Sequence, residues 1–140
     1  MSQRILVVDD DHAVRESLAR VLESEGYAVQ LAPDGKHALQ MVREEPPGLI
    51  LLDITMPGKN GWDIFDRIEK LYPFIPVIII TARPNQQGRA SGYGIDALME
   101  KPLDLPVLLQ TIERLLTETQ AERIARMSRP DFATAHLNAA

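Results

Sequence analysis

Residues 49–53 read LILLD, four large aliphatic residues followed at once by the acid Asp53. A continuous apolar run of this length is typical of a parallel strand buried on both faces, because a half-exposed strand alternates apolar and polar residues. Residues 5–8 (ILVV) and 77–80 (VIII) have the same character, and each run is also followed by a polar residue. These three runs predict the centre of a parallel sheet.

Two weaker runs complete the predicted sheet. Residues 97–99 (ALM) form one, and residues 27–31 (YAVQL) are mixed enough for an edge strand. Stretches with one apolar helical face lie between the runs, with Asp11, Asp34 and Asp104 as predicted N-terminal caps and Gly26 as a predicted stop. The alternation predicts an α/β fold, a doubly wound five-stranded parallel sheet with helices on both faces.

The predicted domain covers residues 1–118, and residues 119–140 are expected to form a helical extension and a disordered tail after Ser128. Between Thr81 and Ile95 the chain has three glycines and no apolar stripe, so the connecting helix there is expected to be short or irregular. The whole chain has 140 residues, which fits a single domain of ordinary size.

Composition excludes several classes of protein. The chain is 45% hydrophobic and 25% charged, as expected of a globular domain, and it has no cysteine for thiol chemistry or cysteine–zinc sites. Its net charge of −5 argues against a nucleic-acid-binding surface spread over the domain. The N-terminus carries neither a signal-peptide pattern nor a membrane span, so a cytoplasmic protein with no membrane partner is expected.

Polar side chains follow the predicted strands at the edge where ligands bind in open α/β sheets. Asp9 and Asp10 follow the first strand, Asp53 the third, Thr81 the fourth and Lys101 the fifth. Carboxylates that lie so near to one another repel each other unless a cation lies among them, and Mg²⁺ prefers oxygen ligands of this kind. Three carboxylates, one ammonium and one divalent cation together are neutral, so the sequence predicts a magnesium site. Adding a phosphoryl group to Asp53 would add about one negative charge to this neutral cluster. The hydroxyl of Thr81 and backbone N–H groups near Ile54 and Ala82 are then the expected hydrogen-bond donors to the phosphoryl oxygens.

The four motifs that carry these residues resemble, in order and position, the receiver domain of bacterial two-component response regulators, a chemotaxis-regulator-like domain. The motifs are VVDD at 7–10, LDITMPG at 52–58, ITA at 80–82 and KP at 101–102, and the resemblance covers residues 4–117. It implies the flavodoxin-like strand order 2-1-3-4-5 and a Lys101–Pro102 bond that is usually cis.

The resemblance also implies roles for the site residues. Asp53 would accept a phosphoryl group from a sensor histidine kinase or phosphotransfer protein. Asp10, Asp53 and the Thr55 carbonyl would bind Mg²⁺ or Mn²⁺ directly, with Asp9 acting mostly through water. Lys101 would pair with the phosphoryl oxygens and Thr81 would hydrogen-bond them. Such a domain is not an ordinary enzyme, since it only phosphorylates and dephosphorylates itself. It signals to a downstream protein, with homodimerisation on phosphorylation as one form of output.

The family often has Tyr or Phe at the position of Leu98, so an output step that relies on a ring there is not expected. Leu98 is interpreted as core, and the glycine-rich segment 88–94, with Tyr93, is the expected mobile element. Two other functions stay open. A haloacid-dehalogenase-type phosphatase also uses a strand-end Asp, but needs a second Asp where this chain has Thr55. A receiver-like scaffold that is never phosphorylated is the other. With about 20 residues after the domain, a DNA-binding module is not expected within this chain, which is either a single-domain regulator or a fragment.

Overall fold

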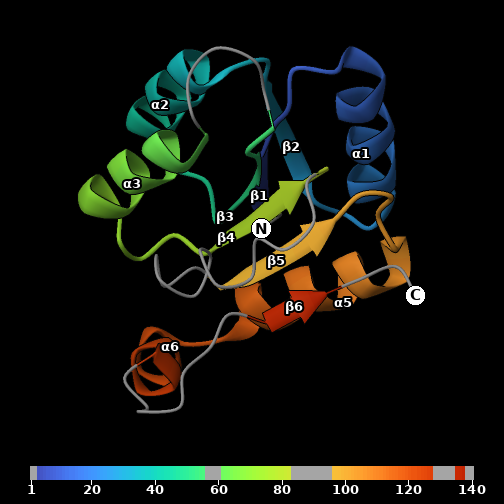
Figure 1. The fold of residues 1–140 in the computed structure, drawn as a ribbon. Coiled ribbons are helices and arrows are strands. Elements are labelled where there is room, and N and C mark those ends of the chain that lie inside the picture. Colours follow the sequence, from blue (N-terminus) through green and yellow to red (C-terminus); the bar gives the residue numbers. More distant parts are fainter. Residues whose placement is uncertain (1–2, 56–60, 83–95, 128–134, 138–140) are drawn as a thin grey trace.

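The computed structural model describes residues 3–55, 61–82, 96–127 and 135–137, and its centre is a parallel sheet (Figure 1). Strands run in the order β2-β1-β3-β4-β5-β6. Their bounds are β1 Arg4–Val8, β2 Ala28–Ala32, β3 Leu49–Asp53, β4 Val77–Thr81, β5 Ala97–Glu100 and β6 Ala135–Leu137. The predicted five-stranded order 2-1-3-4-5 is therefore confirmed, and the structure adds a sixth strand.

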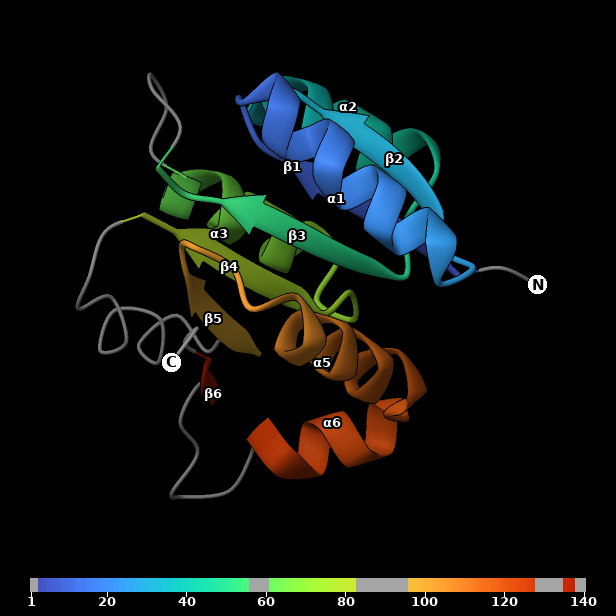
Figure 2. The ribbon, with the colours of Figure 1, turned by 90° about the vertical axis from the view of Figure 1, so that its right-hand side faces the viewer.

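Helices cover both faces of the sheet (Figures 1 and 2). Their bounds are α1 His12–Ser24, α2 Gly35–Glu44, α3 Gly61–Leu71, α5 Leu105–Thr117 and α6 Gln120–Met127. Alternate strand residues point to opposite faces, so the chain has two apolar layers. One layer packs Leu6, Leu52 and Leu98 with α2 and α3, and the other packs Val7, Leu51 and Met99 with α1 and α5.

Local chemistry fixes the helix ends as predicted. The carboxylate of Asp11 accepts from the N–H groups of the first turn of α1, and Asp34 and Asp104 do the same for α2 and α5. Gly26, just past α1, has a φ of +92°, a conformation that other residues rarely adopt. At the start of α3 a Cβ on Gly61 would lie 2.4 Å from Ile54 Cα, so only glycine lets this helix approach β3 so closely.

The C-terminal segment follows its prediction only in part, since the expected helical extension is present but part of the expected disordered tail forms a strand. Gln120–Met127 form the separate helix α6, and Ala135–Leu137 pair in parallel with Ala97–Met99 of β5, where disorder was expected. The strand was missed because three residues carry no readable alternation of polarity. The predicted mobile segment 88–94 lies outside the described residues. Among the helices of the described ranges, none is long and apolar enough to cross a membrane.

Candidate functional site

Three acidic side chains meet at the carboxyl ends of β1 and β3. One carboxylate oxygen from each of Asp9, Asp10 and Asp53 lies within 4.8 Å of the others. Asp9 and Asp53 are 1% and 2% exposed, whereas Asp10 is exposed to solvent. Burying two carboxylates beside a third is costly unless cations and hydrogen bonds compensate, so the contacts of each one determine what the cluster can do.

Both oxygens of Asp53 have partners. Oδ1 accepts hydrogen bonds from the backbone N–H of Thr55 at 2.8 Å and from the Thr55 hydroxyl at 2.5 Å. Oδ2 accepts from Nζ of Lys101 at 2.9 Å. Because β3 and the turn after it hold the first two contacts and β5 positions the third, the carboxylate is fixed from two sides of the site.

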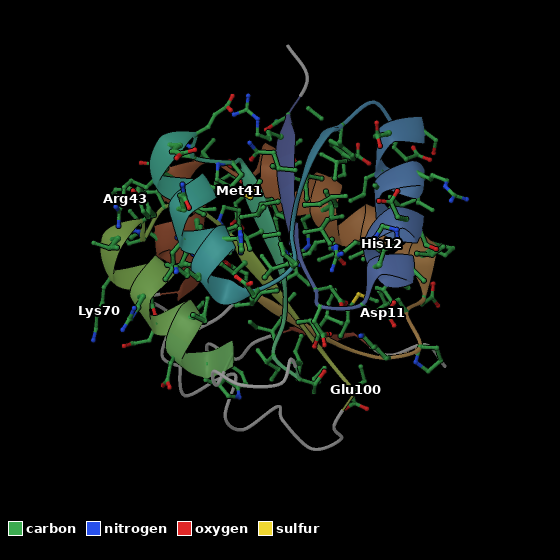
Figure 3. The ribbon with its side chains drawn as sticks, turned by 90° about the horizontal axis from the view of Figure 1, so that it is seen from above. Asp11, His12, Met41, Arg43, Lys70 and Glu100 are labelled. Carbon is green, nitrogen blue, oxygen red and sulfur yellow. The ribbon has the colours of Figure 1, made fainter. Side chains whose placement is uncertain are left out.

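Asp9 is held by the start of α1. Its Oδ1 accepts from the backbone N–H of Asp11 at 2.9 Å, and its Oδ2 lies 3.4 Å from Nζ of Lys101. One turn into α1, Nη1 of Arg15 donates to the backbone carbonyl of Asp9 at 2.6 Å. Asp11 meanwhile caps the helix, so the acidic run after β1 divides into two site residues and one structural cap. Figure 3 labels Asp11 at the start of α1.

Lys101 reaches the two buried carboxylates from the end of β5. Its backbone N–H donates to the carbonyl of Thr81 at 2.8 Å, and the Lys101–Pro102 bond is cis, as the resemblance implied. Thr81 is fully buried and lies in register with Glu100. The N–H of Ile54, an expected phosphoryl donor, instead donates to Ile80 within the sheet at 3.0 Å, because β3 and β4 continue pairing to that point.

Burial and charge separate the two buried carboxyls. Burial raises the pKa of Asp9, with the nearby Asp53 charge adding to the effect, although the Asp11 N–H and Lys101 act against it. Burial also acts to raise the pKa of Asp53, but hydrogen bonds from Thr55 and Lys101 outweigh it, and the pKa is lowered. Burial acts to lower the pKa of Lys101, but the hydrogen bonds and negative charges of Asp53 and Asp9 outweigh it, and the pKa is raised. Asp53 is therefore ionised and pre-positioned at neutral pH.

This donor set fits a hard divalent cation. Asp9 and Asp53 share the ammonium group of Lys101, and Asp10 adds a third carboxylate, so among the described residues the cluster retains excess negative charge that a cation of charge +2 offsets. Mg²⁺ takes one or two carboxylates together with carbonyl and water oxygens, and the exposed Asp10 leaves a side of the cluster open to water. A divalent cation held by protein ligands can polarise a phosphoryl oxygen and orient the group that carries it.

The sequence located the acidic cluster and Lys101 correctly, but it missed two contacts. Thr55 was assigned only a backbone carbonyl role, yet its hydroxyl bonds directly to Asp53. Arg15 was not among the predicted site residues, yet its guanidinium donates to the backbone carbonyl of Asp9. Its position one turn after the Asp11 cap was the available signal, since that turn begins beside the strand end.

An apolar cavity of about 350 Å³ adjoins the site. It lies between α1 and the segment after β5, beside Lys101, and its lining is mainly apolar. The residues that line it are Ala13, Val14, Ser17, Leu18, Lys101, Pro102, Leu103 and Leu105.

The fold and this site define a class of protein, and comparisons with known proteins agree with it. Residues 5–113 match the family model of the response regulator receiver domain. The chain belongs to this family and is a receiver domain of response regulators.

Two curated relatives are response regulators. The chain is 39% identical over 140 residues to the response regulator MprA of Mycobacterium bovis (strain BCG / Pasteur 1173P2), covering 99% of this chain and 61% of that protein. It is 41% identical over 124 residues to MprA of Mycobacterium ulcerans, covering 87% and 53%. The chain thus spans only part of the length of these relatives.

Solved structures show the same architecture. A CheY-like receiver domain protein from Methanospirillum hungatei matches with a TM-score of 0.81 and 32% identity, covering 87% of this chain and 99% of that one. The receiver domain of NtrX from Brucella abortus matches with a TM-score of 0.77 and 33% identity, covering 82% and 99%. The flavodoxin-like, CheY-like assignment from the sequence is confirmed.

Proposed function

We propose that this receiver domain accepts a phosphoryl group on Asp53 in a reaction that needs Mg²⁺ or Mn²⁺. The observation that carries the proposal is the buried, ionised Asp53 carboxylate, held by Thr55 and Lys101 within a cluster of three acids. A carboxylate with a lowered pKa and a fixed position is a competent nucleophile at neutral pH.

The metal would be held by Asp10, Asp53 and the Thr55 carbonyl, with Asp9 contributing through water. When bound, the ion supplies positive charge that stabilises the negative charge developing on the transferred phosphoryl oxygens. Lys101 contributes a second positive charge from the other side of Asp53. Thr81, which is buried at the end of the neighbouring strand, is the proposed hydroxyl donor to a phosphoryl oxygen.

The proposed transfer forms one bond and breaks one. An oxygen of Asp53 attacks phosphorus, the bond from phosphorus to the donor atom breaks, and the electron pair leaves with the donor. For a phosphohistidine the leaving group is an imidazole, which then takes up a proton from solvent. The product is an acyl phosphate on Asp53 with about one more negative charge than the carboxylate. The chain's own chemistry is limited to this self-phosphorylation and to hydrolysis of the acyl phosphate, in which water attacks phosphorus, inorganic phosphate leaves and the Asp53 carboxylate is restored.

The proposed donor is a sensor histidine kinase or a phosphotransfer protein in the cytoplasm. The apolar cavity beside Lys101 supports this, because it offers a protein partner an apolar surface next to the acceptor. The response would pass to a downstream protein, or to a second copy of the chain as a homodimer.

The direct test is labelling with a small phosphodonor. Incubation with acetyl phosphate and Mg²⁺ should add one phosphoryl group by intact mass, and chelation by EDTA should prevent it. Asp53→Asn should abolish labelling, whereas Glu23→Gln, which removes an acid from the far end of α1, should leave it unchanged. Normal labelling of the Asp53→Asn protein would show that the acceptor lies elsewhere, and no labelling of the unaltered protein would favour a scaffold.

The phosphatase alternative loses support. The residue two positions after Asp53 is Thr55, and its hydroxyl is bonded to Asp53 rather than presented as a carboxylic acid. Steady release of phosphate from a small phosphomonoester, in the presence of Mg²⁺, would be needed to restore it.

A further inference from the structure

The C-terminal segment is fastened to the strand that carries Lys101. Helix α6 and strand β6 together are called the strap here, and both contact β5 or the residue before it. Figures 1 and 2 show α6 beyond α5 and β6 beside β5. Since β5 is only four residues long, contacts along its length bear directly on the position of its carboxyl end.

The first fastening is a buried ion pair at the amino end of β5. Asp96 is 2% exposed, and Arg123 of α6 binds it side-on, with Nε to Oδ1 at 3.2 Å and Nη2 to Oδ2 at 3.1 Å. The remaining contact of the guanidinium is Nη1 to the carbonyl of Pro73 at 2.7 Å, and Asp96 also accepts from the N–H of Val77. Such a paired, planar contact fixes both direction and distance.

The ion pair lies in a small recess beside α3. Arg123 and Asp96 share it with apolar side chains of α3 and the following loop, among them Phe65, Tyr72 and Ile75, and with Glu69. An arginine is well suited to this position because its stem packs on apolar walls while the charged end binds a carboxylate. Helix α6 is thus held by the specific polar contacts of Arg123 rather than by apolar packing alone.

The second fastening runs along β5 itself. Ala135, His136 and Leu137 of β6 pair with Ala97, Leu98 and Met99, and Lys101 follows two residues later. Without β6, β5 would present an unpaired edge among the described strands. The strap therefore contacts the chain from Asp96, just before β5, to Met99 within it, and Lys101, just after β5, bonds Asp53 and Asp9.

We propose that the strap restrains the switch, so that its docking on β5 opposes occupation of the acidic pocket by a phosphoryl group. The inference rests on the proposed function. In the structure the strap holds β5 where Nζ of Lys101 bonds the bare Asp53 carboxylate at 2.9 Å. A phosphoryl group on Asp53 places its oxygens further from β3 than the carboxylate oxygens are. Nζ of Lys101 must therefore move back to bond them, and a restrained β5 resists that movement. By linkage, a filled pocket loosens the strap.

The test measures binding of beryllofluoride with Mg²⁺, a non-covalent phosphoryl mimic, to the full chain by calorimetry. Asp96→Asn keeps an acceptor for Val77 but removes the charge that holds Arg123, and Arg123→Gln removes the partner. Each should bind beryllofluoride at least about fivefold more tightly, the lower range of ordinary coupling. The double variant should gain no more than either single one, because both release the same contact. Arg43→Gln on α2, labelled in Figure 3, is the control for losing one positive charge and should bind unchanged.

Amide hydrogen exchange of the unaltered protein gives a second readout that needs no variant. Adding beryllofluoride and Mg²⁺ should speed exchange in 120–127 and 135–137. Unchanged or weaker binding in both single variants, or additive effects in the double variant, overturns the strap. Unchanged or slower exchange in those two segments overturns it as well. Absence of beryllofluoride binding to the unaltered protein overturns the proposed function instead, and this inference with it.

Discussion

The two ends of the sheet both bury carboxylates, but they treat them differently. At the amino end, Asp96 is matched one to one by Arg123 and also accepts from a backbone N–H. At the carboxyl end, Asp9 and Asp53 share a single ammonium group, that of Lys101, with the exposed Asp10 beside them. The first arrangement gives its buried carboxylate a cation of its own, with the partly exposed Glu69 beside it in the recess. In the second, two buried carboxylates share one cation, and burial together with the charge of Asp53 raises the pKa of Asp9.

This difference separates a structural carboxylate from a functional one. A buried acid with a complete set of partners stabilises the position of the elements that supply them, here α6, β4 and the start of β5. A buried cluster with excess charge is held in place by the rest of the fold and gains stability only when a cation or ligand arrives. Four predictions test the distinction, in decreasing order of expected effect.

Removing Arg123, the partner of Asp96 at the amino end of the sheet, should lower the free energy of unfolding more than any other change. Arg123→Ala leaves Asp96 buried without its cation, and breaking such a pair costs about 3–5 kcal/mol. The free energy of unfolding should be measured by urea titration, with Arg43→Ala as a control expected to change it by less than about 0.5 kcal/mol. Equal effects of the two variants would mean that α6 is not fastened to the domain.

Adding Mg²⁺ should stabilise the carboxyl end of the sheet. The gain grows with the logarithm of metal concentration and reaches about 2.7 kcal/mol at one hundred times the dissociation constant. Asp10→Asn should remove most of it, while Asp96→Asn should retain it, because only the first touches the cluster. Melting curves with Mg²⁺ and with EDTA measure both, and an equal loss of the metal response in the two variants would place the ion elsewhere.

The contacts at the carboxyl end of the sheet could be predicted from the sequence better than those at the amino end. Asp9, Asp53 and Lys101 each follow an apolar run, and parallel strands bring their carboxyl ends to one edge, so local patterns were sufficient. Arg123 and Asp96 lie 27 residues apart, and nothing in either neighbourhood marks the pair. The contact depends on where a loop returns α6, which is a property of the tertiary structure. For the same reason β6 was not predicted, whereas the Thr55 hydroxyl contact with Asp53 is local and depends on the conformation of the turn after β3.

Neutralising one acid at the carboxyl end of the sheet should stabilise the metal-free protein. Burial raises the pKa of Asp9, so its ionised form is disfavoured in the fold, and Asp9→Asn keeps an acceptor for the Asp11 N–H. We expect a gain of about 1 kcal/mol in EDTA at pH 7, together with weaker Mg²⁺ binding. The gain should shrink as the pH falls through the raised pKa of Asp9, since the protonated carboxyl is neutral like asparagine. Urea titrations across pH check this, and a loss of stability at pH 7 would contradict it.

The smallest effect is expected for an ion pair with good geometry but no burial. Nζ of Lys70 lies 2.9 Å from Asp66 one turn earlier on α3, a shorter contact than the one between Arg123 and Asp96. Lys70 extends into solvent (Figure 3), and the side chains of Lys70 and Asp66 are 75% and 42% exposed. Water and salt screen such a pair, and holding two long side chains together costs entropy, so the net contribution is small.

Lys70→Gln should therefore leave the melting temperature within about a degree of the unaltered protein, and 0.5 M salt should erase any difference that remains. Arg123→Gln should lower the melting temperature clearly both with and without 0.5 M salt, because Asp96 is buried and dissolved ions cannot screen its charge. The pair of variants isolates burial from distance, since the more destructive change removes the longer contact. If Lys70→Gln proved as damaging as Arg123→Gln, burial would not be what makes the amino end structural. The contrast between the two ends of the sheet would then need another cause.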